Sequence, residues 1–462
     1  MHPFAVEIDD RALALARAGE VLEATPSAVA DGSDGSPAGE DAWGAVRLRP
    51  TTTSTRHLVS VLRDAAPTAR ALALAAAELT RRLRAHPPAP GERLWIAAPA
   101  GAGPAGLGAL LAVARQLALP LDGFVDAAVA SAGALAVDGA AIVVELGLHH
   151  AAATLIEREG GPTCRRRAVV SDRGGLLELY QAWLELINGA LVRQTRFDAL
   201  HDAASEQQLF DRLPALARAA AAAGTAAADL VIGGKPVELP LTRDQLAHSA
   251  QPLLREIVRL LHELRPAGST PTLVVPEAVL ALPGVRTALA QFAGCPLVGT
   301  PPGFAAAATS LLELPPRAAG ESVRLLRRLP SIAQPALAAR TVRSSAEPAE
   351  GVRPAASHVL FAGRTFALVG TPLVVGRAPA AAHALGLAEG LAGVSRRHCT
   401  FVREGTGTVL LDHSRFGTFV NGERVAERAH VYAGDEVRIG DPGVVLALIA
   451  VGEPGAARAA PA

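Results

Sequence analysis

The sequence predicts a protein of two folded parts, an α/β region at residues 1–312 and a small all-β sandwich at residues 357–452. In the first part, short apolar runs alternate with longer amphipathic ones, an order typical of α/β proteins. In the second part, apolar runs of three to eight residues are separated by glycine or charged turns. That spacing is typical of a sandwich of short antiparallel strands.

The elements of the α/β region follow from apolar periodicity. We expect a strand at 93–99 followed by a helix to 119, and a hairpin formed by 140–147 and 151–157. Two long helices are expected at 175–192 and 241–264, and a further strand and helix within 271–294. Thr242 is the expected N-cap of the second long helix, with Asp244 in its first turn.

Residues 313–356 are expected to form a flexible linker. Between 315 and 356 the chain has seven arginines against three glutamates, repeated proline and alanine, and no periodic apolar face. Such a segment lacks the apolar surface that a core needs. Its piece 322–329 is the exception that could form a transient basic helix. Residues 453–462 are expected to be a frayed tail.

Composition limits the classes of function. The formal net charge is zero, which gives no basic surplus for nucleic acid. Cys164, Cys295 and Cys399 lie far apart and have neither the spacing of a metal site nor that of a disulfide framework. We see no signal peptide and no apolar run suited to membrane insertion. We therefore expect a soluble, cytoplasmic protein; the single lysine among 44 basic residues is typical of a GC-rich bacterial genome.

The C-terminal part carries residues suited to holding a phosphate dianion. Guanidinium groups and short hydroxyl donors bind phosphate best, and loops at the end of a rigid sandwich can bring them together. The sequence offers these donors between strand-like runs, at Arg377 and at the consecutive Ser395, Arg396 and Arg397. Asn421 and Gly422 form the strongest short hairpin signal, in a chain that has only two asparagines.

These motifs resemble the forkhead-associated (FHA) domain. The resemblance rests on Gly376-Arg377, on Ser-x-x-His at 395–398, on the hairpin at 417–422, and on the run at 434–440. It implies an all-β sandwich that binds a phosphothreonine peptide through Arg377, Ser395, Arg396 and Arg397. It also implies structural or loop roles for a further set of residues, which are Gly376, His398, Phe416, Gly417, Thr418, Asn421 and Gly422.

One position departs from the FHA pattern. Phe416 stands where the family usually has an asparagine that bonds the peptide backbone. The phenyl ring either offers an apolar platform to the peptide or packs on its own domain. The insert at 378–393 is expected to form an extended loop at the binding edge.

The order of the pieces in residues 1–312 resembles the ATPase domain of the actin and DnaK-type chaperone superfamily, a duplicated ribonuclease-H-like fold. Residues 4–30 resemble its first phosphate segment, and 140–157 stand where its second phosphate hairpin belongs. Residues 171–184 resemble its Gly-Gly helix start, and 272–289 its adenosine segment.

The phosphate loops depart from that superfamily together. Asp9, Glu145 and Gly147 keep places of the nucleotide site, but the glycines and threonines that let backbone N–H groups approach phosphate are missing. We therefore expect a pseudo-ATPase with no catalytic residue and no required cofactor, although ATP binding stays open. We expect no metal site, because no third ligand stands at a suitable spacing from His149 and His150.

Three hypotheses about function follow. The first is a non-catalytic signalling adaptor that binds a threonine-phosphorylated protein, with a serine/threonine kinase as a further candidate partner. The second is a nucleotide-dependent switch whose actin-like region still binds ATP. The third is a scaffold that binds unphosphorylated partners. None of the three involves nucleic acid or membrane insertion.

Overall fold

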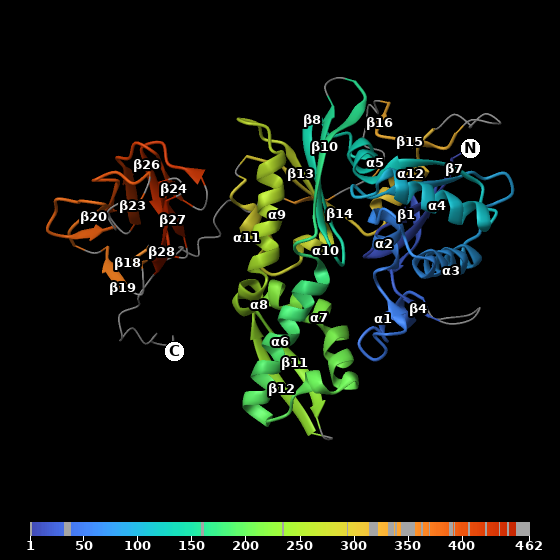
Figure 1. Ribbon diagram of the computed structural model, residues 1–462, viewed down its shortest axis with the longest axis horizontal. Helices are drawn as coiled ribbons and strands as arrows, with labels where there is room; N and C mark the ends of the chain where they lie inside the picture. Colours follow the sequence, from blue (N-terminus) through green and yellow to red (C-terminus); the bar gives the residue numbers. More distant parts are fainter. Residues whose placement is uncertain are drawn as a thin grey trace, which may run out of the picture. The chain divides into compact units, whose positions relative to one another are not determined.

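The computed structural model describes residues 2–31, 38–158, 161–232, 235–292, 294–313, 322–330, 337, 340–342, 356–361, 364–368, 370–387, 391, 393–404, 407–420, 423–433, 435–440 and 443–449. The chain divides into Met1–Ala346, called unit 1 here, and Glu347–Ala462, called unit 2. Figure 1 shows their helices and strands.

The first sheet of unit 1 has the strand order β15-β7-β6-β1-β2-β3. Strands β1, β2 and β3 form an antiparallel meander, and β6 and β7 continue the sheet in parallel beyond β1. The central strands are apolar on both faces, as a sheet covered on both sides requires. The strands are β1 (Phe4–Ile8), β2 (Ala12–Arg17), β3 (Glu20–Pro26), β6 (Leu94–Ala98), β7 (Leu121–Asp126) and β15 (Arg324–Leu326).

The second sheet of unit 1 has the order β16-β10-β9-β8-β13-β14-β17. It again joins an antiparallel meander, β8 to β10, to two parallel strands, β13 and β14. Unit 1 therefore repeats one strand arrangement in its two sheets. The strands are β8 (Gly139–Leu146), β9 (Ala151–Arg158), β10 (Thr163–Ser171), β13 (Thr272–Pro276), β14 (Leu297–Thr300), β16 (Arg328–Leu329) and β17 (Arg340–Val342).

Helices accompany both sheets, and a separate hairpin of two strands lies beyond the second (Figure 1). The helices are α1 (Glu40–Trp43), α2 (His57–Arg63), α3 (Ala69–Ala85), α4 (Pro104–Gln116), α5 (Ala127–Ala134), α6 (Leu176–Thr195), η1 (Ala199–His201), α7 (Ala203–Ala223), α8 (Arg243–Ser249), α9 (Gln251–Leu264), α10 (Glu277–Leu280), α11 (Val285–Leu289) and α12 (Phe304–Ser310). The remaining strands are β4 (Val29–Ala30), β5 (Thr53–Ser54) and the hairpin of β11 (Thr225–Ile232) and β12 (Lys235–Thr242). None of the helices among the described residues has both the length and the apolar character needed to cross a bilayer.

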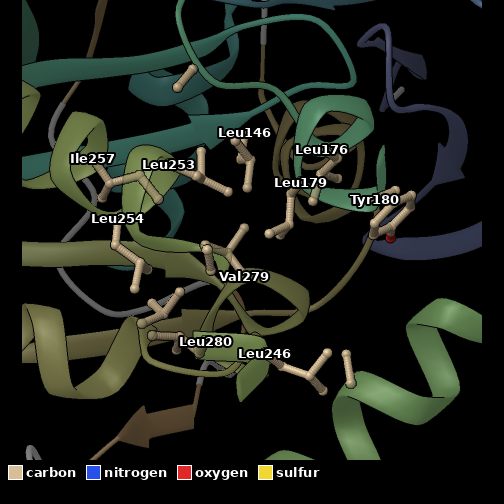
Figure 2. Packing of buried hydrophobic residues seen from close by; sticks show 14 of the residues in the cluster. Leu146, Leu176, Leu179, Tyr180, Leu246, Leu253, Leu254, Ile257, Val279 and Leu280 are labelled. Carbon is tan, nitrogen blue, oxygen red and sulfur yellow. The ribbon is translucent and has the colours of Figure 1, made fainter. Parts of the chain in front are cut away.

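The largest apolar core of unit 1 joins its second sheet to α6 and α9 (Figure 2). Leu146 of β8, Leu179 of α6 and Leu253 of α9 meet there. Trp183 of α6 is fully buried in the same core, and its indole N–H donates to the Leu246 carbonyl oxygen at 3.0 Å. A buried indole with its donor satisfied contributes apolar area without leaving an unpaired polar group.

Most expected elements of residues 93–294 are present, and the helix expected at 241–264 is divided. Thr242 caps α8 through a capping box with Gln245. The helix then breaks at Ala250, and α9 restarts with Pro252 in its first turn, where the missing proline N–H removes no helical hydrogen bond.

Residues 324–329 and 340–342 of the expected linker contribute three strands to the sheets of unit 1. β15 pairs with β7, β16 pairs with β10, and β17 pairs with β14. The expectation of an unpaired tether or a basic helix therefore does not hold for residues 324–329. Leu329 is buried in an apolar cluster beneath α5, so a few leucines among arginines suffice to anchor short edge strands.

Unit 2 consists of two sheets with the orders β19-β18-β28-β27-β24-β25 and β21-β20-β22-β23-β26. Buried side chains of both sheets form one core, among them Val359 and Leu446 from the first and Phe401 from the second. The arrangement is a β-sandwich, as expected. Its strands are β18 (His358–Phe361), β19 (Arg364–Ala367), β20 (Leu373–Gly376), β21 (Ala384–Gly386), β22 (Cys399–Glu404), β23 (Gly407–Asp412), β24 (Thr418–Val420), β25 (Glu423–Arg424), β26 (Arg428–Val431), β27 (Glu436–Ile439) and β28 (Val444–Ile449).

The insert at 378–393 is not only a loop. Its residues Ala384–Gly386 form β21, which pairs in parallel with β20. The side chain of His383 also hydrogen-bonds the Ala367 carbonyl oxygen at 2.7 Å.

Candidate functional site

Three segments of unit 2 meet beyond the end of β20, at residues 376–378, 395–398 and 412–418. We call them the loop cluster. The backbone N–H of Arg377 donates to the Ser395 carbonyl oxygen, and that of Ala378 to the Arg396 carbonyl oxygen, both at 3.1 Å. A Cβ on Gly376 would lie 2.1 Å from the Arg396 oxygen. Only glycine therefore permits this close approach of the two backbones.

A buried imidazole holds the second segment to the third. The backbone N–H of Ser395 donates to Nδ1 of His398 at 3.1 Å, and Nε2 of His398 lies 3.1 Å from the Gly417 carbonyl oxygen. Since Nδ1 accepts and a carbonyl can only accept, the proton belongs on Nε2 and the ring is neutral. Burial lowers the pKa of His398, although the Gly417 carbonyl opposes that shift.

The third segment is shaped by its own side chains. Asp412 Oδ1 accepts from the backbone N–H of Ser414 at 3.0 Å and from the Thr418 hydroxyl at 2.7 Å. Ser414 Oγ in turn accepts from the N–H of Gly417 at 2.8 Å, and Gly417 has a φ of +92°, which a side chain would disfavour. Thr418 is fully buried, so its hydroxyl fixes the loop and faces no ligand.

Ser395 lies at the centre of the loop cluster. Its Oγ accepts from the backbone N–H of Arg415 at 3.2 Å. A hydroxyl has one donor as well as acceptor lone pairs, so the hydrogen of Ser395 Oγ stays available to an anion. Its position thus joins the Arg377 segment to the Arg415 segment.

The exposed side chains of the loop cluster are mainly arginines. Arg377, Arg396 and Arg415 are exposed, and none of them forms an ion pair with another residue that the structure describes. The guanidinium of Arg415 lies 5.9 Å from the ring centroid of Phe416, within cation–π range. Phe416 is 52% exposed, which leaves its ring accessible beside the arginine.

The structure thus brings together Arg377, Ser395 and Arg396 of the expected set. Arg397 is exposed too, but its guanidinium reaches back to the Thr400 hydroxyl at 3.4 Å. Arg415 was missed by sequence reasoning; its position between Ser414 and Phe416, inside a motif already singled out, was the available signal. Asn421 and Gly422 lie outside the described residues.

Unit 1 has a second cluster, where the β1–β2 turn meets the β8–β9 turn. Asp10 Oδ1 accepts from the backbone N–H of Leu148, and Asp10 Oδ2 from that of His149, both at 3.0 Å. His150 Nδ1 lies 3.3 Å from Asp10 Oδ2. A Cβ on Gly147 would lie 2.1 Å from Asp10 Oδ1, so glycine is required for this contact.

The acidic groups around these turns differ in their affinity for protons. Burial opposes the ionisation of Asp10, but the adjacent imidazole of His150 and the backbone N–H of His149 lower its pKa to about 2. Burial and the charge of Asp10 raise the pKa of Asp9. Burial also raises the pKa of Glu145 to about 7, while one of its oxygens accepts from the Ala100 N–H at 2.8 Å.

Two cavities lie beside these turns. The first has a volume of about 60 Å³ and is lined by Asp9 and Glu145 among others. The second has a volume of about 570 Å³, and its lining includes Arg11, Tyr180 and Arg218. The structure thus brings Asp9 and Glu145 to one small cavity, and Gly147 to the carboxylate of the neighbouring Asp10.

The expectation that no third ligand lies near His149 and His150 is wrong for His150. His149 is engaged elsewhere, 3.2 Å from the Thr55 hydroxyl and 3.1 Å from the Arg56 guanidinium. His150, however, lies with Asp9 and Asp10, and one possible ligand atom from each is within 4.8 Å of the others. The further ligands come from a turn about 140 residues away in the chain, which spacing along the sequence does not reveal.

Replacing His398 with alanine should destabilise the loop cluster. It removes the partners of the Ser395 N–H and the Gly417 carbonyl, and each orphaned buried group costs about 1–3 kcal/mol. Hydrogen exchange of peptides covering residues 395–417 of the full chain measures this. The exposed His430→Ala serves as the control. Equal exchange in the two variants would contradict a structural role for His398.

The stability of unit 2 should also depend on pH through His398. The unfolded chain takes up a proton near pH 6.5, whereas the folded state keeps the ring neutral to lower pH. This contribution to the free energy of unfolding is therefore complete above about pH 6.5 and is lost as pH falls towards the lowered folded-state pKa. Denaturation from about pH 8 to about pH 5 tests it, and the slope should be smaller for His398→Gln than for wild type. Equal slopes would rule out this contribution.

The comparison with protein families agrees with this geometry. No curated protein matches the sequence. Residues 373–440 match the family model of the FHA domain, and they include all three segments of the loop cluster. This segment of the chain is therefore an FHA domain, a module that binds phosphothreonine.

Proposed function

We propose that this protein is a non-catalytic signalling adaptor that binds threonine-phosphorylated partners through its FHA domain. The observation that carries the proposal is that the backbone segments bearing the exposed Arg377, Arg396 and Arg415 meet around Ser395, within a segment that matches the FHA family. A serine/threonine kinase that carries a phosphorylated threonine would be a partner of this kind. Nucleic acid is not among the proposed partners, because the chain has no net positive charge.

The chemistry of the loop cluster suits a phosphate dianion. A phosphothreonine carries a charge of about −1.5 to −2 and three acceptor oxygens. Arg377 and Arg396 supply charge-assisted donors, and the Ser395 hydroxyl supplies a short neutral one. Since His398 fixes the Ser395 backbone from behind, these donors are held in place before the peptide arrives.

Unit 1 serves in this proposal as an actin-like scaffold without ATPase activity. Two sheets that each add two parallel strands to an antiparallel meander support the ribonuclease-H-like duplication. The two N–H groups of the β8–β9 turn that could approach a phosphate are bonded to Asp10 instead. A nucleotide phosphate would have to displace that carboxylate, and its own charge would be repelled by it.

A nucleotide-dependent switch is the second candidate, and the larger cavity favours it. Its volume of about 570 Å³ lies in the usual range for small-molecule sites. Arg11 and Arg218 at its wall can contact a phosphate, although Glu40 and Asp211 also line it, and Leu148 and Leu282 provide apolar surface. Titration of the full chain with ATP, with and without Mg²⁺, separates this candidate from the adaptor.

Arg377→Ala should weaken the binding of a phosphothreonine peptide at least tenfold, because it removes a charge-assisted contact of roughly 1.5–3 kcal/mol. Calorimetry with peptides selected from a phosphorylated library measures this. Arg428→Ala is a matched control, because this exposed arginine lies on the edge strand β26, which β22 and β23 separate from β20, and its side chain pairs with Glu404 of β22. Equal affinity for the unphosphorylated peptides would favour the scaffold that needs no phosphate and would overturn the proposal.

The full chain should not hydrolyse ATP at a measurable rate, because the phosphate-loop glycines and threonines that hold the phosphates and position the attacking water are missing. A phosphate-release assay checks this, with Asp9→Ala as the diagnostic variant. Turnover by wild type that Asp9→Ala abolishes would contradict the pseudo-ATPase part of the proposal. Tight ATP binding without turnover would support the switch.

A further inference from the structure

The contact between the β1–β2 and β8–β9 turns places three metal-ligating side chains together. Asp9 and Asp10 follow β1 in the first sheet of unit 1, and His150 precedes β9 in the second. One oxygen or nitrogen from each lies within 4.8 Å of the others. Donors on opposite sides of one ion are about 4.2 Å apart for bonds of about 2.1 Å, so a small side-chain rotation would close the group on an ion.

Asp10 is already held as a ligand should be. Its two oxygens accept the N–H groups of Leu148 and His149, and each oxygen keeps a further lone pair. Carboxylates that ligate metals are usually fixed by such outer hydrogen bonds. Gly147 allows this geometry, because a Cβ there would overlap Asp10 Oδ1 and would lie 2.8 Å from His150 Nδ1.

His150 gives the second, independent indication. Its residue is 3% exposed, and its Nδ1 has no hydrogen-bond partner among the described residues. Nδ1 faces the Asp10 carboxylate at 3.3 Å, close enough for an ion pair but without the alignment of a hydrogen bond. A buried nitrogen in that state is uncommon in native proteins, and an ion bound between it and the carboxylates would satisfy it.

The charge of the cluster points the same way. Two adjacent carboxylates are crowded against one imidazole in a largely buried place. The nearby Glu145 also has one buried oxygen with no hydrogen-bond partner in the part of the chain that the structure describes. The charge of Arg11 offsets part of the charge of Asp9, and carboxylates are costly to bury unless they are paired or bind a metal. A dication would relieve the repulsion between Asp9 and Asp10.

We propose that Asp9, Asp10 and His150 bind a divalent first-row transition metal ion, such as Zn²⁺ or Mn²⁺. An imidazole nitrogen together with carboxylate oxygens suits such ions, whereas Mg²⁺ prefers oxygen ligands and water. Three protein ligands leave positions for water or an exogenous group. The ion would join the two sheets of unit 1 directly, and the site needs neither a nucleotide nor the FHA domain.

The test uses the full-length chain, stripped with EDTA and titrated with Zn²⁺, Mn²⁺ and Mg²⁺ while its melting temperature is recorded. Bound metal is counted by mass spectrometry after dialysis. We expect Zn²⁺ or Mn²⁺ to raise the melting temperature and to bind at about one ion per chain, with Mg²⁺ much weaker. Asp9→Asn and His150→Gln should each weaken binding at least about tenfold.

His149→Gln is the matched control, because the side chain of His149 contacts Thr55 and Arg56, and the substitution keeps the backbone N–H that donates to Asp10. It should bind the ion like wild type. Co²⁺ added to the wild type gives a readout that needs no variant, because a visible absorption band would report nitrogen and oxygen ligation at a protein site.

The proposal is overturned by any of three results. One is no bound transition metal and no Co²⁺ band, in which case Asp10 and His150 form only an ion pair. Another is equal binding by wild type, Asp9→Asn and His150→Gln, which would place the ion elsewhere. The last is a loss of binding in His149→Gln as large as in His150→Gln, because the effect would then not be specific to His150, the imidazole assigned as the ligand.

Discussion

The loop cluster of the FHA domain depends on one imidazole that must stay neutral. His398 accepts a hydrogen bond from the Ser395 backbone on one side and donates one to the Gly417 carbonyl on the other. A second proton would bring an N–H of the ring against the N–H of Ser395, and the bridge between the two segments would open. The burial that lowers the pKa of His398 is therefore also what keeps Ser395 in place.

The contact between the β1–β2 and β8–β9 turns of unit 1 is also held by one polar side chain that bonds backbone groups of the opposite segment, here a carboxylate in place of an imidazole. There the carboxylate of Asp10 satisfies two backbone N–H groups of the opposite turn. In both places a glycine allows the approach, since a Cβ on Gly376 or on Gly147 would lie 2.1 Å from an oxygen of the partner segment. In both places, a polar side chain hydrogen-bonds backbone groups that would otherwise be buried without partners.

Sequence reasoning succeeded where a signal is local. The short apolar runs of unit 2 became strands, and the hairpin expected at 140–157 is present as β8 and β9. It failed where two distant segments decide the outcome. The arginine-rich run at 324–329 has no pattern of its own and becomes strand only because β7 and β10 offer edges. The grouping of Asp9 with His150 depends on the meeting of two sheets. Arg415 was visible in the sequence, but its role required knowing that its N–H reaches Ser395.

The positive charges of the loop cluster have no acidic partner among the described residues of the free protein. The backbones that carry Arg377, Arg396 and Arg415 meet at Ser395, and among the described residues none of the three guanidiniums has a carboxylate partner. The chain has as many acidic as basic residues, and elsewhere in the same unit Arg428 is paired with Glu404. Like charges within about a Debye length, roughly 8–10 Å, repel one another. An arriving dianion removes that repulsion as well as forming new hydrogen bonds, so its binding is favoured by more than its direct contacts. A neutral hydroxyl at the same place would leave the repulsion intact, and this difference is the physical basis for distinguishing a phosphorylated threonine from a free one.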